Sequence, residues 1–189
     1  MKNIAIFASH NGSGFDTIVE AIKEKKLPIK ICLVISNNTN SPVLQKAKNE
    51  NIKHYVVNQN NSMDVNARLT ELLRENECEY IFLSGYMKKL HSSITENFKV
   101  LNTHPSLLPK FGGAGMYGTR VHQAVIESQE KISGVTIHEV NAQYDDGEII
   151  LQKEIDLSED ETVETLQAKI KKLEKIAIVE GLMKYLNIS

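Results

Sequence analysis

Three polar side chains whose types suit acyl chemistry fall in two short segments, VLNTHPSLLP at 100–109 and YDDG at 144–147. Asn102 and His104 stand two residues apart at the end of an expected strand, so an extended backbone points both to the same side. Pro105 restricts His104 to extended conformations, which keeps the pair in that geometry. An amide N–H and an imidazole that face one cavity are suitable donors for the oxyanion formed during acyl transfer.

A carboxylate beside the imidazole would orient the ring and raise its pKa. Asp145 and Asp146 are the candidates, because the YDDG turn belongs to the same later part of the chain. The spacing also fits an ordinary surface histidine and a common turn, so these residues by themselves leave a non-catalytic interpretation open. The sequence has no serine elbow, no HExxH motif and no cysteine nucleophile paired with a base. Any acyl chemistry is therefore expected to be direct transfer without an acyl-enzyme.

A second candidate site is the glycine turn SHNGSGF at 9–15. Gly12 and Gly14 let the backbone approach a ligand closely, and free N–H groups at a helix start favour an anion. The spacing matches neither a dinucleotide fingerprint nor a Walker loop. An ordinary strand-to-helix turn remains the alternative, and a phosphate monoester is the ligand that the turn favours.

The elements that must position these residues alternate between strand and helix through the first half of the chain. Apolar runs typical of buried strands occupy 3–9, 29–36, 53–57 and 80–87, and a fifth strand follows a short helix and ends at His104. Apolar residues at helical spacing occupy 15–26, 42–51 and 63–78. This order predicts a doubly wound α/β fold with a mostly parallel sheet and helices on both faces.

The later part of the chain has a different pattern. Segments 133–141 and 147–157 read as two strands of a half-exposed antiparallel extension, and 160–186 as a long terminal helix capped by Thr162. The chain has no repeats, linkers or low-complexity tracts, which predicts a single domain spanning 1–189. Within it, we expect 1–100 to form the phosphate-binding α/β part and 101–189 to carry the catalytic segment.

Composition excludes several classes of function. The 189 residues are 41% hydrophobic, enough for a core, and the net charge of -2 includes no long basic stretch for nucleic acid. No signal peptide and no membrane-spanning run are visible, so we expect a soluble cytoplasmic protein with small-molecule partners. Cys32 and Cys78 match no metal-ligand spacing and are expected to be reduced and structural. No metal is expected, and the oligomeric state stays open.

Taken together, these motifs resemble those of the glycinamide ribonucleotide formyltransferase family of purine biosynthesis. NTHPSLLPKFGG resembles the family's N-x-H-P-S-L-L-P segment, and SGYMKKL at 84–90 resembles its folate-binding strand end. SGVTIHEVNAQYDDGEIILQ at 133–152 is similar to the segment that brings in the family's aspartate. SHNGSG lies where the family binds the substrate phosphate. The similarity runs in order over nearly the whole chain and implies a Rossmann-like formyltransferase fold.

The resemblance implies roles for individual residues. Asp145 is preferred to Asp146 because it stands two residues before Gly147, as in the family's D-x-G. The implied catalytic residues are Asn102, His104 and Asp145; the implied phosphate turn is Asn11, Gly12, Ser13 and Gly14; Glu174 is implied to contact the substrate; and Met87, Lys88, Leu90 and Tyr144 are implied to hold the folate.

Two departures from the family pattern concern binding. His10 stands where the family turn has its first glycine, and Gly14 replaces its asparagine, which removes one side-chain contact to the phosphate. The segment FGGAGMYGTRVH at 111–122 is longer than the equivalent loop of many relatives. We expect its glycines at 112–118 to form a mobile flap that admits a bulky folate.

The implied reaction is transfer of the formyl group of 10-formyltetrahydrofolate to the amine of glycinamide ribonucleotide. One alternative is a related enzyme with another acceptor, either water or the amine of a nucleotide sugar. Such hydrolases usually carry a preceding regulatory domain, and the sugar enzymes carry extra C-terminal sequence. Another alternative is a non-catalytic module that binds a phosphorylated ligand, which would have no need of the Asn102, His104 and Asp145 set.

Overall fold

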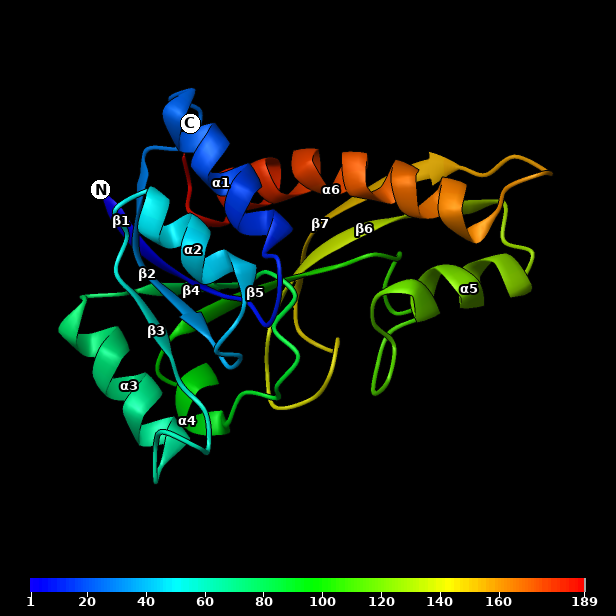
Figure 1. Ribbon diagram of the computed structural model, residues 1–189. Coiled ribbons are helices and arrows are strands. Elements are labelled where there is room, and N and C mark those ends of the chain that lie inside the picture. The colour runs from blue at the N-terminus through cyan, green and yellow to red at the C-terminus, as the bar shows by residue number, and fades with distance from the viewer. Residues whose placement is uncertain (189) are drawn as a thin grey trace. The chain divides into compact units, whose positions relative to one another are not determined.

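The computed structural model of the chain describes residues 1–188, which form two compact units, Met1–Leu101 and a second unit that begins at Asn102 (Figure 1). The seven strands follow the order β3-β2-β1-β4-β5-β6-β7. The chain passes from the first unit to the second within β5 (Lys99–His104). The α/β fold with a mixed sheet, antiparallel late strands and a long last helix is the one that the sequence predicts.

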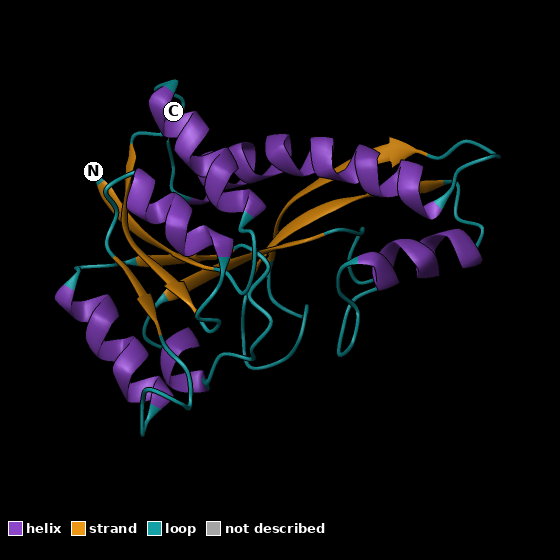
Figure 2. Cartoon of the chain, in the orientation of Figure 1, coloured by secondary structure: helices purple, strands orange, loops and turns teal. Residues whose placement is uncertain are grey.

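In the first unit, β1 lies between β2 and β4 and pairs with both in parallel, while β3 pairs in parallel with β2. Helices follow the strands in sequence, and Figure 2 distinguishes the helices in purple from the strands in orange. The strands of this unit are β1 (Lys2–Phe7), β2 (Ile29–Ser36), β3 (His54–Val56) and β4 (Tyr80–Leu83). Its helices are α1 (Ser13–Lys23), α2 (Pro42–Asn49), α3 (Val65–Glu75) and α4 (Ser92–Thr95).

The core of the first unit is built around β1, whose neighbours on both sides hide it from water. Ile4, Ile6 and Phe7 have no exposed surface, and Phe15 of α1 is 1% exposed. Unbroken apolar runs in the sequence are explained by this position, because both faces of a central parallel strand are covered.

The two cysteines differ from the expectation of reduced thiols. Cys32 on β2 and Cys78, just before β4, are joined by a disulfide that links positions 46 residues apart in the sequence. Neither residue belongs to a recognisable spacing motif, so only the folding of β2 against the rest of the first unit brings the two sulfur atoms together.

The second unit consists of an antiparallel pair of strands with a long helix across it. β6 (Ile132–Glu139) pairs with β7 (Ile149–Asp156), and α6 (Val163–Tyr185) packs on both strands (Figure 1). The approach is close, since a Cβ added at Gly181 of α6 would lie 2.9 Å from Ile137 Cγ1. Thr162 caps α6 through a reciprocal pair of hydrogen bonds with Thr165, as the sequence predicts for the cap itself.

Two details of this unit differ from the prediction. β7 is half-exposed as expected, but β6 is buried throughout 133–138 because both of its faces are covered. One face is covered by α6. The other is covered by the segment at 107–108, because a Cβ on Gly134 would meet Leu107 and the N–H of Leu108 donates to Thr136 Oγ1 at 3.1 Å. In addition, α5 (Thr119–Glu127) was not predicted, although two buried valines four residues apart follow Gly118.

None of the helices in the described part of the chain is both long and apolar enough to cross a membrane.

Candidate active site

The end of β5 presents polar side chains on both faces of the strand. Asn102 is half-buried and His104 is 3% exposed, and the two-residue spacing places them on the same face. Thr103 between them points the other way, where its hydroxyl donates to Glu174 Oε1 of α6 at 3.3 Å. Burial raises the pKa of the Glu174 carboxyl, against the opposing effect of that hydrogen bond. Glu174 is thus placed on the opposite side of β5 from the Asn102–His104 pair.

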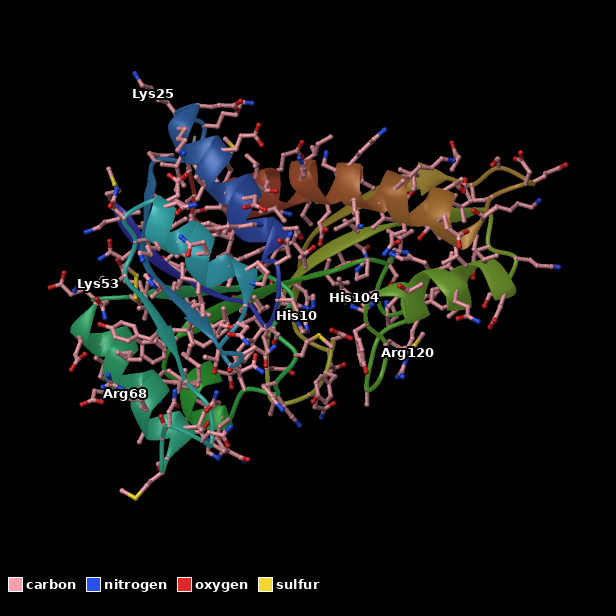
Figure 3. The ribbon with its side chains drawn as sticks, viewed as in Figure 1. His10, Lys25, Lys53, Arg68, His104 and Arg120 are labelled. Atoms are coloured by element: carbon pink, nitrogen blue, oxygen red, sulfur yellow. A yellow bond between two sulfur atoms is a disulfide. The ribbon has the colours of Figure 1, made fainter. Side chains whose placement is uncertain are left out.

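Both ring nitrogens of His104 have neighbours in the second unit. Nε2 lies 2.8 Å from the carbonyl oxygen of Phe111, and a carbonyl only accepts, so Nε2 carries a proton. Nδ1 lies 3.6 Å from Asp145 Oδ2. Figure 3 labels His104 at the end of its strand, beside the loop that leads into α5. A protonated ring would therefore face Asp145 with one N–H and the Phe111 carbonyl with the other.

The carboxylate of Asp145 is positioned by the glycines that follow β5. The N–H of Gly113 donates to Asp145 Oδ2 at 2.9 Å, and a Cβ on Gly112 would lie 3.2 Å from the Cβ of Asp145. Asp145 itself adopts a left-handed backbone with φ of 54°. Asp146 is exposed and has no hydrogen bond or ion pair within the part of the chain that the structure describes. Of the two aspartates, the structure brings only Asp145 to the histidine.

His138 is a functional candidate that the sequence interpretation missed. Its Nε2 lies 3.2 Å from Asn102 Nδ2 and 3.6 Å from Asp145 Oδ1, while its Nδ1 lies 2.8 Å from the carbonyl oxygen of Glu139. The ring is 1% exposed. Burial lowers the pKa of the His138 imidazole, against the opposing effects of the Glu139 carbonyl and Asp145. The sequence alternation places His138 with Thr136 on the polar side of the strand, so only the burial of both faces of β6 shows that this ring must have partners.

The glycine turn of the first unit is tightly held by its neighbours. The carbonyl of His10 accepts hydrogen bonds from Ser41 Oγ at 2.6 Å and from the N–H of Val43 at 3.2 Å. Lys46 Nζ donates to the carbonyl of Asn11 at 2.9 Å and also forms an ion pair with Asp16 Oδ2 of α1 at 2.5 Å. Gly12 is left-handed, with φ of 63°, and a Cβ there would lie 2.6 Å from Val43 Cγ2. Only glycine fits that position without a shift.

The N–H groups of this turn are not all available to an anion. The N–H of Gly14 donates to Ser84 Oγ at 2.9 Å in the interior, and a Cβ on Gly14 would lie 2.8 Å from Phe82 Cε1. Gly14 is therefore required for the packing of α1 against β4. The backbone N–H groups that remain for an anion are those of residues 12 and 13. Asn11 and Ser13 are exposed, as an anion site requires.

The four residues implied for folate binding differ in exposure. Met87 is 44% exposed and its N–H donates to Ser9 Oγ at 2.7 Å, and Lys88 is also exposed. Leu90 is only 7% exposed, so it belongs to the core of the first unit and offers little surface to a ligand. Tyr144 of the second unit is 52% exposed. Within the described residues, no group of three or more His, Cys, Asp or Glu side chains could hold a metal ion.

Comparison with known proteins finds one family and close structural similarity. The formyl transferase family matches residues 2–182. A phosphoribosylglycinamide formyltransferase of Bacillus subtilis is 34% identical over 179 residues, covering 92% of this chain and 89% of the relative. A chloroplastic phosphoribosylglycinamide formyltransferase of Vigna unguiculata is 34% identical over 174 residues, and the chain spans 56% of its length.

Solved structures agree over almost the whole length. The crystal structure of glycinamide ribonucleotide transformylase 1 from Symbiobacterium toebii has a TM-score of 0.90 at 28% identity, covering 99% of this chain and 88% of that one. The corresponding protein of Geobacillus kaustophilus gives a TM-score of 0.88 at 27% identity, with 98% of each chain covered.

Proposed function

The chain belongs to the formyl transferase family, and from that membership we infer that it transfers the formyl group of 10-formyltetrahydrofolate to the amine of glycinamide ribonucleotide. This reaction is a step of purine biosynthesis. The observation that carries the proposal at the level of residues is the arrangement of Asn102, His104 and Asp145 at the end of β5. Such a set suits attack on an acyl carbon, whereas a binding module has no use for an oxyanion stabiliser.

Attack of the neutral amine on the formyl carbon produces a tetrahedral carbon that bears a negative oxygen. Asn102 supplies an N–H donor to that oxygen at any pH. The Nε2–H of His104 is the second donor, and in this structure the carbonyl of Phe111 accepts it. Phe111 lies next to the glycines and has a left-handed backbone with φ of 56°. We infer that this segment shifts when substrate binds and releases the His104 N–H to the oxyanion.

Asp145 has two roles in the proposed reaction. Its Oδ2 lies 3.6 Å from His104 Nδ1, so a negative charge stands beside the ring that would donate to the developing oxyanion. Its carboxylate would also position a water molecule that carries the proton from the attacking amine to the leaving nitrogen. The Gly113 N–H holds Oδ2 in place for both tasks.

Binding roles follow from exposure and charge. In the first unit, the turn at Asn11, Gly12 and Ser13 would bind the substrate phosphate, with the Lys46–Asp16 ion pair beside it. Gly14 supports this turn through packing rather than through its own N–H. Met87 and Lys88 of the first unit and Tyr144 and Glu174 of the second are proposed to contact the folate or the ribonucleotide. We also propose that the protein is cytoplasmic and binds neither nucleic acid nor membranes.

The test is an absorbance assay for formyl loss from 10-formyl-dideazafolate, run with and without glycinamide ribonucleotide. We expect formyl loss only with the amine. Equal rates in both conditions would identify a hydrolase instead, and loss only with an amino sugar nucleotide would identify the other acceptor class.

Loss of one oxyanion donor typically costs ~100- to 1,000-fold in kcat. Asn102→Ala and His104→Ala are each expected to show that loss with little change in either KM.

A further inference from the structure

His138 lies behind Asn102 and contacts it through the same nitrogen that faces Asp145. We propose that His138 is a positioning residue for Asn102: its uncharged ring, protonated on Nδ1, accepts a hydrogen bond from the Asn102 amide and aims the second amide N–H at the formyl oxygen. The proposal rests on the proposed function, because it assigns the orientation of a group whose role in catalysis is itself proposed.

The tautomer of His138 follows from its contact with Glu139. Nδ1 lies 2.8 Å from the Glu139 carbonyl oxygen, which has no hydrogen to donate. A hydrogen bond at this distance therefore requires the proton on Nδ1. An uncharged ring has only one N–H, so Nε2 carries a lone pair and must accept. The backbone of β6 thus determines which ring nitrogen acts as the acceptor.

The orientation of the Asn102 amide follows in turn from that lone pair. Nδ2 lies 3.2 Å from His138 Nε2, so one of its two N–H groups is used by the histidine. The reversed amide would set its oxygen against the Nε2 lone pair, which loses the hydrogen bond and leaves a buried acceptor unsatisfied. With the amide held this way, the second N–H of Nδ2 stays free for the substrate.

The charges around His138 explain why its state matters. Asp145 Oδ1 lies 3.6 Å from Nε2, beyond hydrogen-bond distance, and His104 contributes an opposing positive charge when protonated. The Glu139 carboxylate is held by the Tyr185 hydroxyl. Burial disfavours the charged His138 ring. A second proton would make Nε2 a donor to Asp145, and Asn102 would then lose its acceptor. Protonation of His138 and correct aim of Asn102 exclude each other.

Two substitutions separate this role from simple packing. In His138→Gln, the side-chain oxygen reaches the place of Nε2 and can still accept from Asn102. In His138→Asn, the shorter amide reaches only the place of Nδ1 and offers Asn102 no acceptor. We expect the glutamine variant to keep kcat within about threefold and the asparagine variant to lose ~10- to 100-fold, the range found when a residue that orients a metal-binding side chain is replaced. Both KM values should change little.

A double-mutant cycle tests whether His138 acts through Asn102. If it does, Asn102→Ala combined with His138→Asn has the same kcat as Asn102→Ala alone. Multiplied losses in the double variant would overturn the positioning role. Normal kcat in Asn102→Ala would instead refute the proposed function, so the two failures can be told apart.

The tautomer can be measured without any variant. Ring nitrogen chemical shifts of ¹⁵N-histidine-labelled protein, with His138 assigned by comparison with His138→Gln, distinguish an Nδ1–H ring from an Nε2–H ring. We expect the Nδ1–H tautomer at neutral pH. An Nε2–H tautomer, or a doubly protonated ring at pH 7, would contradict the proposal whatever the kinetics show.

Discussion

At the scale of single residues, the proposed chemistry depends on which atom each side chain presents. His104 presents Nε2–H to a backbone carbonyl and Nδ1 to Asp145, and His138 presents a lone pair to Asn102. Asp145 therefore lies between two imidazoles, with one oxygen near each. Because both distances are 3.6 Å, the carboxylate does not distinguish the two rings. The backbone carbonyls do, since Phe111 requires a proton on Nε2 of His104 and Glu139 requires one on Nδ1 of His138.

The two neighbouring aspartates provide a matched pair of variants. Asp145→Asn keeps the shape of the side chain but removes the negative charge 3.6 Å from His104 Nδ1, so we expect a large fall in kcat with little change in either KM, measured by steady-state kinetics. Asp146→Asn changes an exposed side chain that contacts neither histidine, so it should leave kcat nearly unchanged and alter the free energy of unfolding by no more than ~0.5 kcal/mol. A severe loss in Asp146→Asn beside a normal Asp145→Asn would show that the assignment is reversed.

At the scale of elements, turns rather than helices or strands hold the reactive groups. The β1–α1 turn depends on a left-handed glycine against α2, and the loop after β5 depends on glycines that approach Asp145. In both places the sequence has a glycine because either a positive φ or the lack of space requires it. The same glycines are the positions where added side chains should change binding.

Gly12→Ala tests the first of these turns. The new Cβ would meet Val43 Cγ2 at 2.6 Å in addition to the strain of φ at +63°, so α1 and α2 must separate slightly. We expect a loss of ~1–3 kcal/mol in the free energy of unfolding and a higher KM for the ribonucleotide with a nearly unchanged KM for the folate. Gly115→Ala is the control, because its φ is +85° but no atom lies within 4 Å. If Gly12→Ala raised only the folate KM, the phosphate would have to bind elsewhere.

At the scale of the whole molecule, one covalent link contributes to stability. The disulfide closes a sequence separation of 46 residues, and chain entropy predicts a contribution of about 4 kcal/mol for a loop of that order. Urea unfolding with and without a reductant should show this difference, and Cys32→Ser should match the reduced protein. Two free thiols in unreduced native protein would contradict the link. Activity should not change, because neither cysteine belongs to the proposed site.

The pH dependence of stability follows from His122 and His138. Burial lowers the pKa of both rings in the folded protein. Near pH 6.5 the two rings therefore bind protons in the unfolded chain but remain neutral in the folded protein. The free energy of unfolding is therefore highest above pH 6.5. It falls as the pH drops from 6.5 toward the lowered pKa values of the two rings in the folded protein. Thermal unfolding between pH 8 and pH 5 should show this decline, and it should be smaller in His122→Gln. A midpoint that rises toward pH 5 would contradict it.

The sequence by itself determined the α/β architecture. Unbroken apolar runs at β1, β2 and β4 and the strand–turn–helix order at the first glycine turn depend on local periodicity, which survives without knowledge of the fold. It also placed Asn102 and His104 on one face, because the two-residue period of a strand is a local property. The spacing alone left Asp145 and Asp146 open, and it was the resemblance to the family's D-x-G motif that selected Asp145.

Tertiary structure alone decided the partners of these groups. His138 joins Asn102 only because β6 of the second unit carries it there, and Phe111 reaches His104 Nε2 only through the course of the loop. The engagement of the Gly14 N–H by Ser84, 70 residues away, and the Cys32–Cys78 link are of the same kind. These contacts join residues that lie far apart in the sequence, so no local helix or strand periodicity relates one to the other. They arise when apolar burial brings elements together, and a hydrogen bond then forms where donor and acceptor meet.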